Sequence, residues 1–375
     1  MLKEITFKNY KAFREEQTLQ LKPLTILIGK NSSGKSAIAK LPTLIESSLS
    51  GRFSQPLAIN NNGIELGGNF RDLVYNHGIT LEFGLKDQNE HLLVSVASGL
   101  RPADLPKIST WKFTSLDSKM SIKKGVEDNF EGFLDVPSSI KSLSLHTDYI
   151  GPFRALPERN YPSPTSIVKK VGIHGGDAYS ILIQDSISTE QVLLKKVNNW
   201  YQENFEGWGI TVEADGSQYA VKLVRDGLKV NLKDVGQGMS QALPLVVRAL
   251  MPTTQETLII MEQPELHLHP AAHGNLAELF ADSLTDGNKS YLIETHSRNF
   301  ILRIRRLIAE KKLSPNQVNL YYVDFDEEKN ASYLEKIDID SLGKVTSWPE
   351  NIFSEALDEA SAIRTAQLKQ ERDAD

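Results

Sequence analysis

The sequence contains no cysteine, which excludes disulfides, thiolate zinc sites and cysteine nucleophiles. It also lacks any run near the roughly 20 apolar residues that a membrane helix needs, and its N-terminus lacks the apolar stretch of a secretory signal. We therefore expect a cytoplasmic protein. An excess of positive charge is missing too, because the formal net charge is −6. Dedicated nucleic-acid-binding domains are usually basic, so any such contact must be local or supplied by a partner.

The pattern of apolar residues predicts an α/β fold. Polar and apolar residues alternate near the N-terminus, which predicts a hairpin leading into a buried strand at Leu24–Ile28. Later, helical segments alternate with the apolar strands Thr257–Met261 and Ser290–Ile293, which is typical of a mostly parallel sheet. We divide the chain into the N-terminal part of a head (1–50), a β-rich insertion (51–148), a helical lobe (149–232), the C-terminal part of the head (233–345), and a C-terminal helix with a disordered tail (346–375).

A phosphate-binding loop follows the first buried strand. Residues 29–36, Gly-Lys-Asn-Ser-Ser-Gly-Lys-Ser, fit the pattern G-x-x-x-x-G-K-[ST] at every fixed position. Its glycines let backbone N–H groups turn inward around an anion, and the following helix adds the positive end of its dipole. We expect Lys35 to reach the β- and γ-phosphates of ATP and Ser36 to ligate magnesium, and Pro42 to kink or end the helix. The nucleotide-binding residues predicted here are Gly29, Lys30, Asn31, Ser32, Ser33, Gly34, Lys35, Ser36 and Ala37.

Two further elements are suited to phosphate or metal. Glu262 directly follows the strand Thr257–Met261, and open α/β sheets bind ligands at the carboxyl ends of their strands, so Glu262 is predicted to hold magnesium together with Ser36. A second helix N-terminus suited to anions is predicted where a glycine-rich stretch precedes a helical run, although an ordinary helix cap is the alternative. Its candidate residues are Gly236, Gly238, Ser240 and Gln241.

The motif-bearing segments are Met261-Glu-Gln-Pro-Glu-Leu-His-Leu-His-Pro270, Glu294-Thr-His-Ser297, Asp234-Val-Gly-Gln-Gly-Met-Ser-Gln-Ala-Leu-Pro244, Tyr149-Ile-Gly-Pro-Phe-Arg154 and Ser347-Trp-Pro349. Together they resemble ATPases related to the overcoming-lysogenization-defect family, which are ABC-class enzymes of bacterial anti-phage systems. The resemblance implies an ABC-ATPase-type head that binds ATP and Mg²⁺ and closes head to head, at least as a homodimer. It also implies that the glycine-rich helix start completes the site of the opposite protomer and that His296 contacts the γ-phosphate.

The sequence does not decide which residue, if any, is the general base. In the ABC class a glutamate directly after the strand-end carboxylate polarises the attacking water, whereas this chain has Gln263, which can orient a water but cannot accept its proton. Either Glu265 is the base, which we favour, or hydrolysis is slow and the ATP-bound dimer is long-lived. A structural alternative for Glu265 is stabilisation of the following helix dipole. The candidate catalytic residues are thus Glu262, Gln263, Glu265 and His296.

The leading functional hypothesis is the ATPase subunit of an anti-phage module whose effector, a nuclease or a toxin, is a separate protein. Asp324-Phe-Asp326 resembles the paired acids of a TOPRIM nuclease but is better explained as the acidic part of a hairpin. A RecF-like DNA repair ATPase and a slow nucleotide-gated scaffold are the alternatives.

Three weaker features remain. Tyr10 and Phe13 are either adenine contacts or, more simply, core. His267 and His269 lack a third ligand for a metal. A basic helical arc is a candidate for nucleic-acid contact, although such an arc is usually only solvated. Its residues are Arg298, Arg303, Arg305, Arg306, Lys311 and Lys312.

Overall fold

The computed structural model describes residues 2–49, 55–61, 63–99, 101, 104–115, 119–122, 144–346, 348–349, 361–364 and 366–367. Strands and helices both occur throughout these residues, so the predicted α/β class is confirmed. Most of the predicted C-terminal helix and tail, residues 346–375, lies outside the described residues. Within the described ranges, no helix has both the length and the apolar character needed to span a bilayer.

A mostly parallel sheet forms the head, as the sequence predicts. Its six strands have the order β10-β15-β16-β3-β17-β18, and only β18 is antiparallel to its neighbour. Because the other strands are parallel, their carboxyl ends meet at one edge, and the loops after β3, β15 and β16 lie together there. The strands are β3 (Leu24–Gly29), β10 (Thr147–Ile150), β15 (Thr257–Glu262), β16 (Lys289–Glu294), β17 (Val318–Asp326) and β18 (Ala331–Ile337).

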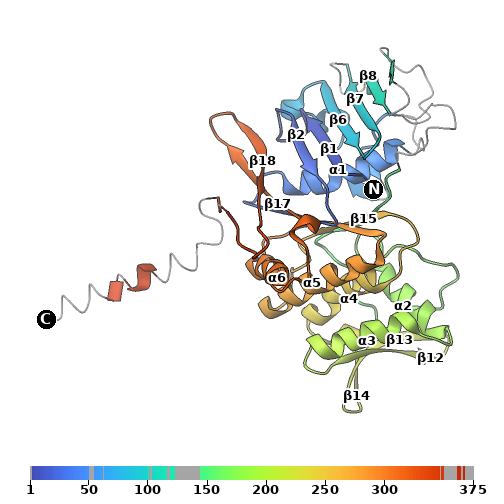
Figure 1. Cartoon of the computed structure of the whole chain (residues 1–375). Coiled ribbons are helices and arrows are strands. Elements are labelled where there is room, and N and C mark those ends of the chain that lie inside the picture. The colour runs from blue at the N-terminus through green and yellow to red at the C-terminus, as the bar shows by residue number, and fades with distance from the viewer. Residues whose placement is uncertain are drawn as a thin grey trace.

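An antiparallel sheet lies at one end of the molecule (Figure 1), with the strand order β2-β1-β6-β7-β8-β9. The predicted N-terminal hairpin is β1 with β2, and β6 pairs with the other side of β1. Strands from the predicted insertion at 51–148 thus extend the sheet that the N-terminal hairpin begins. The strands are β1 (Glu4–Lys8), β2 (Gln17–Gln20), β6 (Thr80–Lys86), β7 (His91–Ala97), β8 (Lys107–Thr114) and β9 (Lys119–Ile122), and β4 (Asn60–Asn61) pairs with β5 (Ile64–Glu65) nearby in the chain.

A helical lobe lies at the opposite end (Figure 1). The helices of the lobe predicted at 149–232 are α2 (Asp177–Ile187) and α3 (Val192–Asn204). The lobe also contains an antiparallel sheet that the sequence analysis does not predict. Its strands are β11 (Tyr161–Pro162), β12 (Gly209–Asp215), β13 (Gln218–Arg225) and β14 (Leu228–Asn231).

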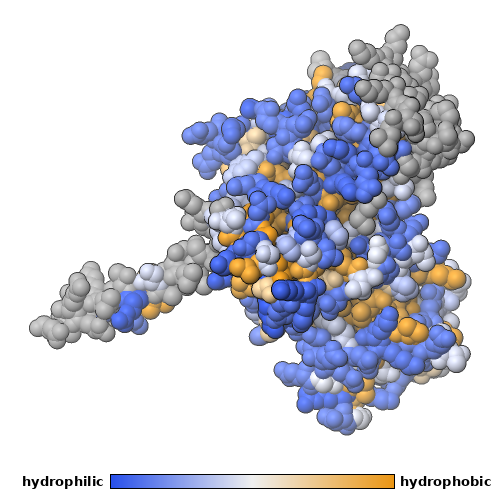
Figure 2. Space-filling view, in the orientation of Figure 1, coloured by the Kyte–Doolittle hydropathy of each residue, from blue (hydrophilic) through white to orange (hydrophobic). Residues whose placement is uncertain are grey.

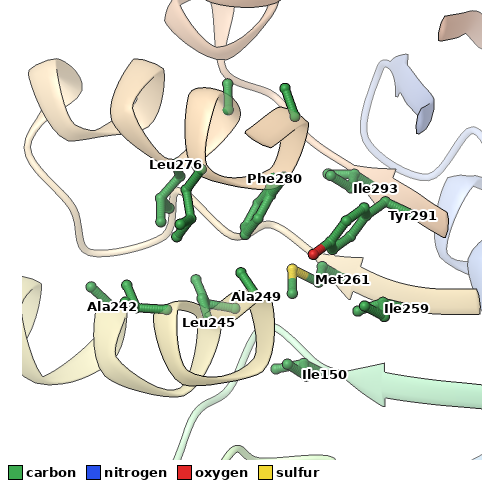
Figure 3. Close-up of a cluster of buried hydrophobic side chains, with 14 of the residues drawn as sticks. Ile150, Ala242, Leu245, Ala249, Ile259, Met261, Leu276, Phe280, Tyr291 and Ile293 are labelled. Carbon is green, nitrogen blue, oxygen red and sulfur yellow. The ribbon is translucent and has the colours of Figure 1, made fainter. Parts of the chain in front are cut away.

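The period-two alternation of the central strands divides the core into two. Along β15, Leu258 and Ile260 face a cluster that includes α1 (Lys35–Leu49) and the antiparallel sheet, whereas Ile259 and Met261 face the other helices. Figure 3 shows this second cluster, in which the apolar side of α4 lies against α5 and the central sheet. Its helices are α4 (Gln237–Leu250), α5 (Pro270–Ser283) and α6 (Arg298–Ala309). In the view of Figure 2, hydrophilic residues cover most of the two ends, and apolar residues show mainly in between.

Pro42 does not end α1. The helix continues past Pro42 to Leu49, although proline cannot donate the backbone hydrogen bond of a helix interior. α1 packs between two sheets and buries Ile38, Leu41 and Leu44, and this burial offsets the lost hydrogen bond.

A buried ion pair ties the edge strand β10 to α4. The Arg248 guanidinium lies 2.5 Å from an Asp148 carboxylate oxygen, and both side chains are only 3% exposed. Arg248 also donates to the Thr253 hydroxyl at 3.2 Å. Burial raises the pKa of Asp148 in spite of the neighbouring arginine. The pair therefore costs desolvation and depends on both partners being present.

Replacing Asp148 with Ala leaves Arg248 charged and buried without its partner, so the free energy of unfolding should fall by about 3–5 kcal/mol. Urea unfolding followed by circular dichroism measures the loss. The control is Glu158→Ala, which breaks an exposed pair with Lys233 and should have little effect. Equal effects of the two substitutions would contradict a structural role of the buried pair.

Candidate functional site

A pocket of about 320 Å³ lies at the edge where β3, β15 and β16 end. It brings together three segments that are far apart in the sequence: the phosphate loop, the residue after β15, and the end of β16 with the residues that follow. The lining residues are Asn31, Ser32, Gly34, Lys35, Ser36, Ala37, Gln263, Glu294 and His296. Most of the predicted nucleotide-binding residues and two of the predicted catalytic residues thus face one cavity.

Glycine is required at both ends of the phosphate loop by close packing. Gly29 has a φ of 146°, and a Cβ there would lie 2.0 Å from the carbonyl oxygen of Val323 in β17. Gly34 has a φ of 101°, and a Cβ there would lie 2.8 Å from the ring of Phe13. Any side chain at these positions would force the loop away from the sheet edge, so the two glycines hold its backbone N–H groups at the pocket.

Lys35 is the first residue of α1 and is only 3% exposed. Its ammonium donates to the backbone carbonyl of Lys30 at 2.5 Å, which folds the side chain back along the loop. Burial lowers the pKa of Lys35, and the nearby carboxylates of Glu294 and Asp324 act in the opposite direction. By contrast, the side chain of Lys30 points outward and forms an ion pair of 3.2 Å with Asp324.

Two buried carboxylates stand side by side at the strand ends. Glu262 ends β15 and Glu294 ends β16, and the parallel pairing places them directly opposite each other. Burial, and secondarily Glu294, raises the pKa of Glu262 to about 7, while a hydrogen bond with Tyr149 acts against this shift. Burial also raises the pKa of Glu294, although a hydrogen bond with Ser36 and the charge of Lys35 oppose it. The arrangement favours a proton or a metal cation between the strand ends.

The loop after β15 connects the remaining catalytic candidates. Gln263 lines the pocket in a left-handed conformation, with a φ of 47°, and its backbone N–H donates to the carbonyl of Glu294 at 2.8 Å. Glu265 accepts a hydrogen bond of 2.7 Å from the backbone N–H of His296. The His296 side chain is exposed at the pocket, and partial desolvation and then Lys35 lower its pKa, which favours the neutral imidazole. Gln263, Glu265 and His296 therefore form one connected unit.

Arg154 joins this unit to α4. Its guanidinium donates to the carbonyls of Gln263 at 3.4 Å and Leu266 at 3.0 Å, and its own carbonyl accepts from the Gln241 side chain at 3.4 Å. Burial lowers the pKa of Arg154 to about 10, while Glu265 acts to raise it. Arg154 ends the motif Tyr149–Arg154, which carries part of the family resemblance. No role for it can be predicted from the sequence, because its hydrogen-bond acceptors are backbone carbonyls.

The predicted second anion site at the start of α4 divides into exposed and buried residues. Gly236 caps the helix and is exposed, and a Cβ there would meet nothing within 4 Å. Gly238 packs closely on the backbone of His267. Ser240 is buried and donates to the carbonyl of Gln237 at 3.1 Å, and Gln241 is buried against Arg154. In the described part of the chain, the start of α4 does not line the pocket of its own head.

Several weaker candidates have structural explanations. Tyr10 and Phe13 are fully buried and stack edge to face on Phe7, so they belong to the core, and the Tyr10 hydroxyl donates to the carbonyl of Ala37. Asp324 is bonded to Lys30 and Tyr322, and Asp326 is paired with Lys329, in the predicted β17–β18 hairpin. The ring of His269 caps α5 by accepting from the backbone N–H of Ala271.

Part of the basic arc at α6 is paired with acidic side chains in the described chain. Arg303 and Arg306 pair with Glu278 and Glu310, and Lys312 lies within ion-pair distance of both carboxylates. Arg305 donates to a backbone carbonyl and lies over the ring of Trp348. These contacts favour a solvated helix face over a nucleic-acid contact.

Glu294 is a pocket residue that is not predicted from the sequence, where only His296 of the segment Glu294–Ser297 has an expected role. A signal was available, because Glu294 ends its buried strand just as Glu262 ends the preceding one, and parallel strands bring such residues together.

A protein-family model described as "AAA ATPase domain" matches residues 1–134 and 162–301. A second model, "Protein of unknown function (DUF3696)", matches residues 313–363. No curated protein matches the sequence significantly.

Solved structures of Smc head domains resemble the fold. An Smc head bound to the C-winged helix domain of ScpA has a TM-score of 0.53 and 10% sequence identity, covering 90% of this chain and 98% of that one. An SMC head from Thermotoga maritima has a TM-score of 0.46 and 12% identity, covering 90% of this chain and 99% of that one. The first likeness confirms the predicted ABC-type head fold with its mixed sheet.

Proposed function

The chain belongs to the AAA ATPase domain family, and from that premise we propose that it hydrolyses ATP with magnesium in the pocket at the ends of β3, β15 and β16 and closes head to head as a dimer. Its P-loop ATPase activity follows from the family, and its ABC-type head follows from the fold. The observation that carries the assignment to this pocket is the convergence of Lys35 and Ser36 with Gln263, Glu294 and His296 around one cavity.

The donor set of the pocket fits magnesium. Mg²⁺ takes oxygen ligands and usually keeps one or two carboxylates, waters and phosphate oxygens around it. Ser36, which lines the pocket, and Glu262, which lies buried at the end of β15 beside the lining residue Gln263, would hold it. Glu262 has a buried carboxylate oxygen, Oε1, without a hydrogen-bond partner in the described chain. Bound there, the ion would neutralise charge on the β- and γ-phosphates. Lys35 would add its positive charge, and the phosphate loop its N–H groups.

The two groups proposed to act on the attacking water, Gln263 in the pocket lining and Glu265 behind it in the same loop, differ in what they can do. Gln263 lines the pocket and can orient a water through its amide. Glu265 has one oxygen engaged by the His296 N–H, while its Oε2 is buried and lacks a partner among the described residues. We retain Glu265 as the proposed proton acceptor, because Oε2 is the free carboxylate oxygen of the connected Gln263–His296 unit.

Dimer closure is supported by the lining of the pocket, which contains no described residue of α4 from the same chain. The start of α4 offers an exposed helix N-terminus at Gly236, yet the described residues of α4 contribute nothing to the pocket of the same head. A second copy could place its α4 against the γ-phosphate, as the resemblance to the ABC class implies.

We propose further that the chain works in the cytoplasm as the ATPase subunit of an anti-phage module, with a separate effector protein. The motif resemblance supports this role, and the engagement of Asp324 and Asp326 with lysines of the same chain argues against a nuclease site in the hairpin. The Smc head in one similar structure is bound to a winged-helix domain of ScpA, which offers a precedent for a protein partner. Co-purification from the native host, followed by identification of the bound protein, tests this role.

The dimer proposal predicts that Gly236→Arg blocks closure on ATP and magnesium without weakening ATP binding to one head. Arginine fits in its own head because the position is open, but it would fill the place of the partner's γ-phosphate. Ser240 is unsuitable for this test because it is buried in its own helix.

Because the chain has no native cysteine, Glu327→Cys provides a single label on each exposed hairpin for distance measurements between two heads. Gly236→Ala is the matched control and should close like the parent. Undiminished ATP-dependent closure in Gly236→Arg would argue against the proposed interface.

The base proposal predicts that Glu265→Gln slows single-turnover hydrolysis by about a hundredfold or more, with ATP affinity retained, because the amide cannot accept a proton. Gln263→Glu should then change little. If the site instead lacks a base, the ranking reverses, and Gln263→Glu accelerates hydrolysis. Rapid-quench measurements of both variants decide between these mechanisms, and Glu262 stays intact in each.

A further inference from the structure

Glu294 is the one carboxylate among the described residues that line the pocket. Its side chain is 3% exposed, and its Oε2 atom is buried without a hydrogen-bond partner in the described chain. Ser36, the predicted magnesium ligand of the phosphate loop, lines the same pocket. Glu294 thus shares the cavity with a predicted metal ligand and has an acceptor atom without a partner in the described chain.

Glu262 and Glu294 each have one carboxylate oxygen that accepts no hydrogen bond in the described chain. Their strands pair in register, and each carboxylate retains one buried oxygen without a partner among the described residues, Oε1 of Glu262 and Oε2 of Glu294. A buried acceptor with no donor costs roughly 1–3 kcal/mol, and more when it carries a charge. Two such atoms on adjacent strand ends are therefore costly unless a proton or a metal cation lies between them.

The lysine of the pocket does not fill this role. Lys35 donates to the backbone carbonyl of Lys30, and this contact directs its ammonium along the loop. Lys35 is also needed for the phosphates, which would draw it further toward the nucleotide. A divalent cation that prefers oxygen ligands would bind both free carboxylate oxygens. Mg²⁺ is such a cation, since it is commonly held by one or two carboxylates together with substrate phosphates.

We propose that Glu294 is a second carboxylate for the magnesium ion of bound ATP, acting with Glu262 and Ser36. The inference rests on the proposed function, because it requires nucleotide in this pocket. It adds a residue that the loop pattern and the strand-end rule for β15 do not identify. It also explains why Ser36 and Glu294 line the same cavity, since both groups would face the same ion.

The alternative is that Glu294 only orients the Ser36 hydroxyl. Glu294→Gln separates the two roles, because the amide oxygen can still accept from Ser36 while the negative charge is lost. Glu294→Asp keeps the charge on a shorter side chain. Glu278→Gln is the matched control, because this carboxylate pairs with Arg303 and Lys312 on the helices and does not line the pocket.

The experiment measures free Mn²⁺ by electron paramagnetic resonance in the presence of full-length protein and a non-hydrolysable ATP analogue, and analogue affinity in EDTA by calorimetry. Glu294→Gln should weaken Mn²⁺ binding by at least about tenfold, since loss of even an outer partner of a metal ligand costs that much. Metal-free analogue binding should stay equal or become tighter, because a negative charge near the phosphates is gone. Glu294→Asp should recover part of the Mn²⁺ affinity, and Glu278→Gln should match the parent.

Unchanged Mn²⁺ affinity in Glu294→Gln would overturn the inference while leaving the proposed function intact. Equal losses of metal-dependent and metal-free binding would also overturn it, because they indicate a structural role. If the parent chain bound no analogue under either condition, the proposed function itself would fail, and the inference with it.

Discussion

The parallel pairing of β15 with β16 is the constraint on which the rest of the site depends. It places Glu262 opposite Glu294 at the buried end of the sheet, where desolvation raises the pKa of both carboxyls. The neighbouring strand β3 pairs with β16 on its other side and leads into the phosphate loop, so Lys35 and Ser36 reach the same edge. A sheet with this strand order brings the proposed phosphate-binding and metal-binding groups to one edge.

A second set of contacts links this edge to α4. Arg154 connects the loop after β15 to Gln241, and the Tyr201 hydroxyl of the helical lobe donates to the Met239 carbonyl at 2.6 Å. The buried pair of Asp148 with Arg248 fixes α4 to the strand that precedes Arg154. The proposed dimer surface at the start of α4 is thus held by the same residues that support the loop after β15. A displacement of one of these two elements should therefore displace the other.

The sequence predicts the head well because its signals are local. The strand, loop and helix around residues 24–36 and the strand that ends at Glu262 each carry their own pattern, and the structure places them as predicted. Glu294 and Arg154 have no such local pattern, because their positions depend on tertiary contacts. Glu294 lies opposite Glu262 on the neighbouring strand, and Arg154 bonds to backbone carbonyls far away in the sequence. The lobe sheet is missed although its main strands, β12 and β13, have seven and eight residues. The outcome at Pro42 differs from the prediction because tertiary burial outweighs a local preference.

The central claim is that ATP is hydrolysed between the pocket of one chain and α4 of another. Complementation tests it directly: Lys35→Ala lacks the lysine of the pocket, Gly236→Arg lacks a competent α4 start, and each should be inactive alone. A mixed dimer contains one site with an intact pocket and an intact α4, so we predict that mixing the two variants restores hydrolysis. An inactive mixture, with mixed dimers verified by pull-down on two different tags, would contradict the claim, because a site complete within each chain cannot be rescued in this way.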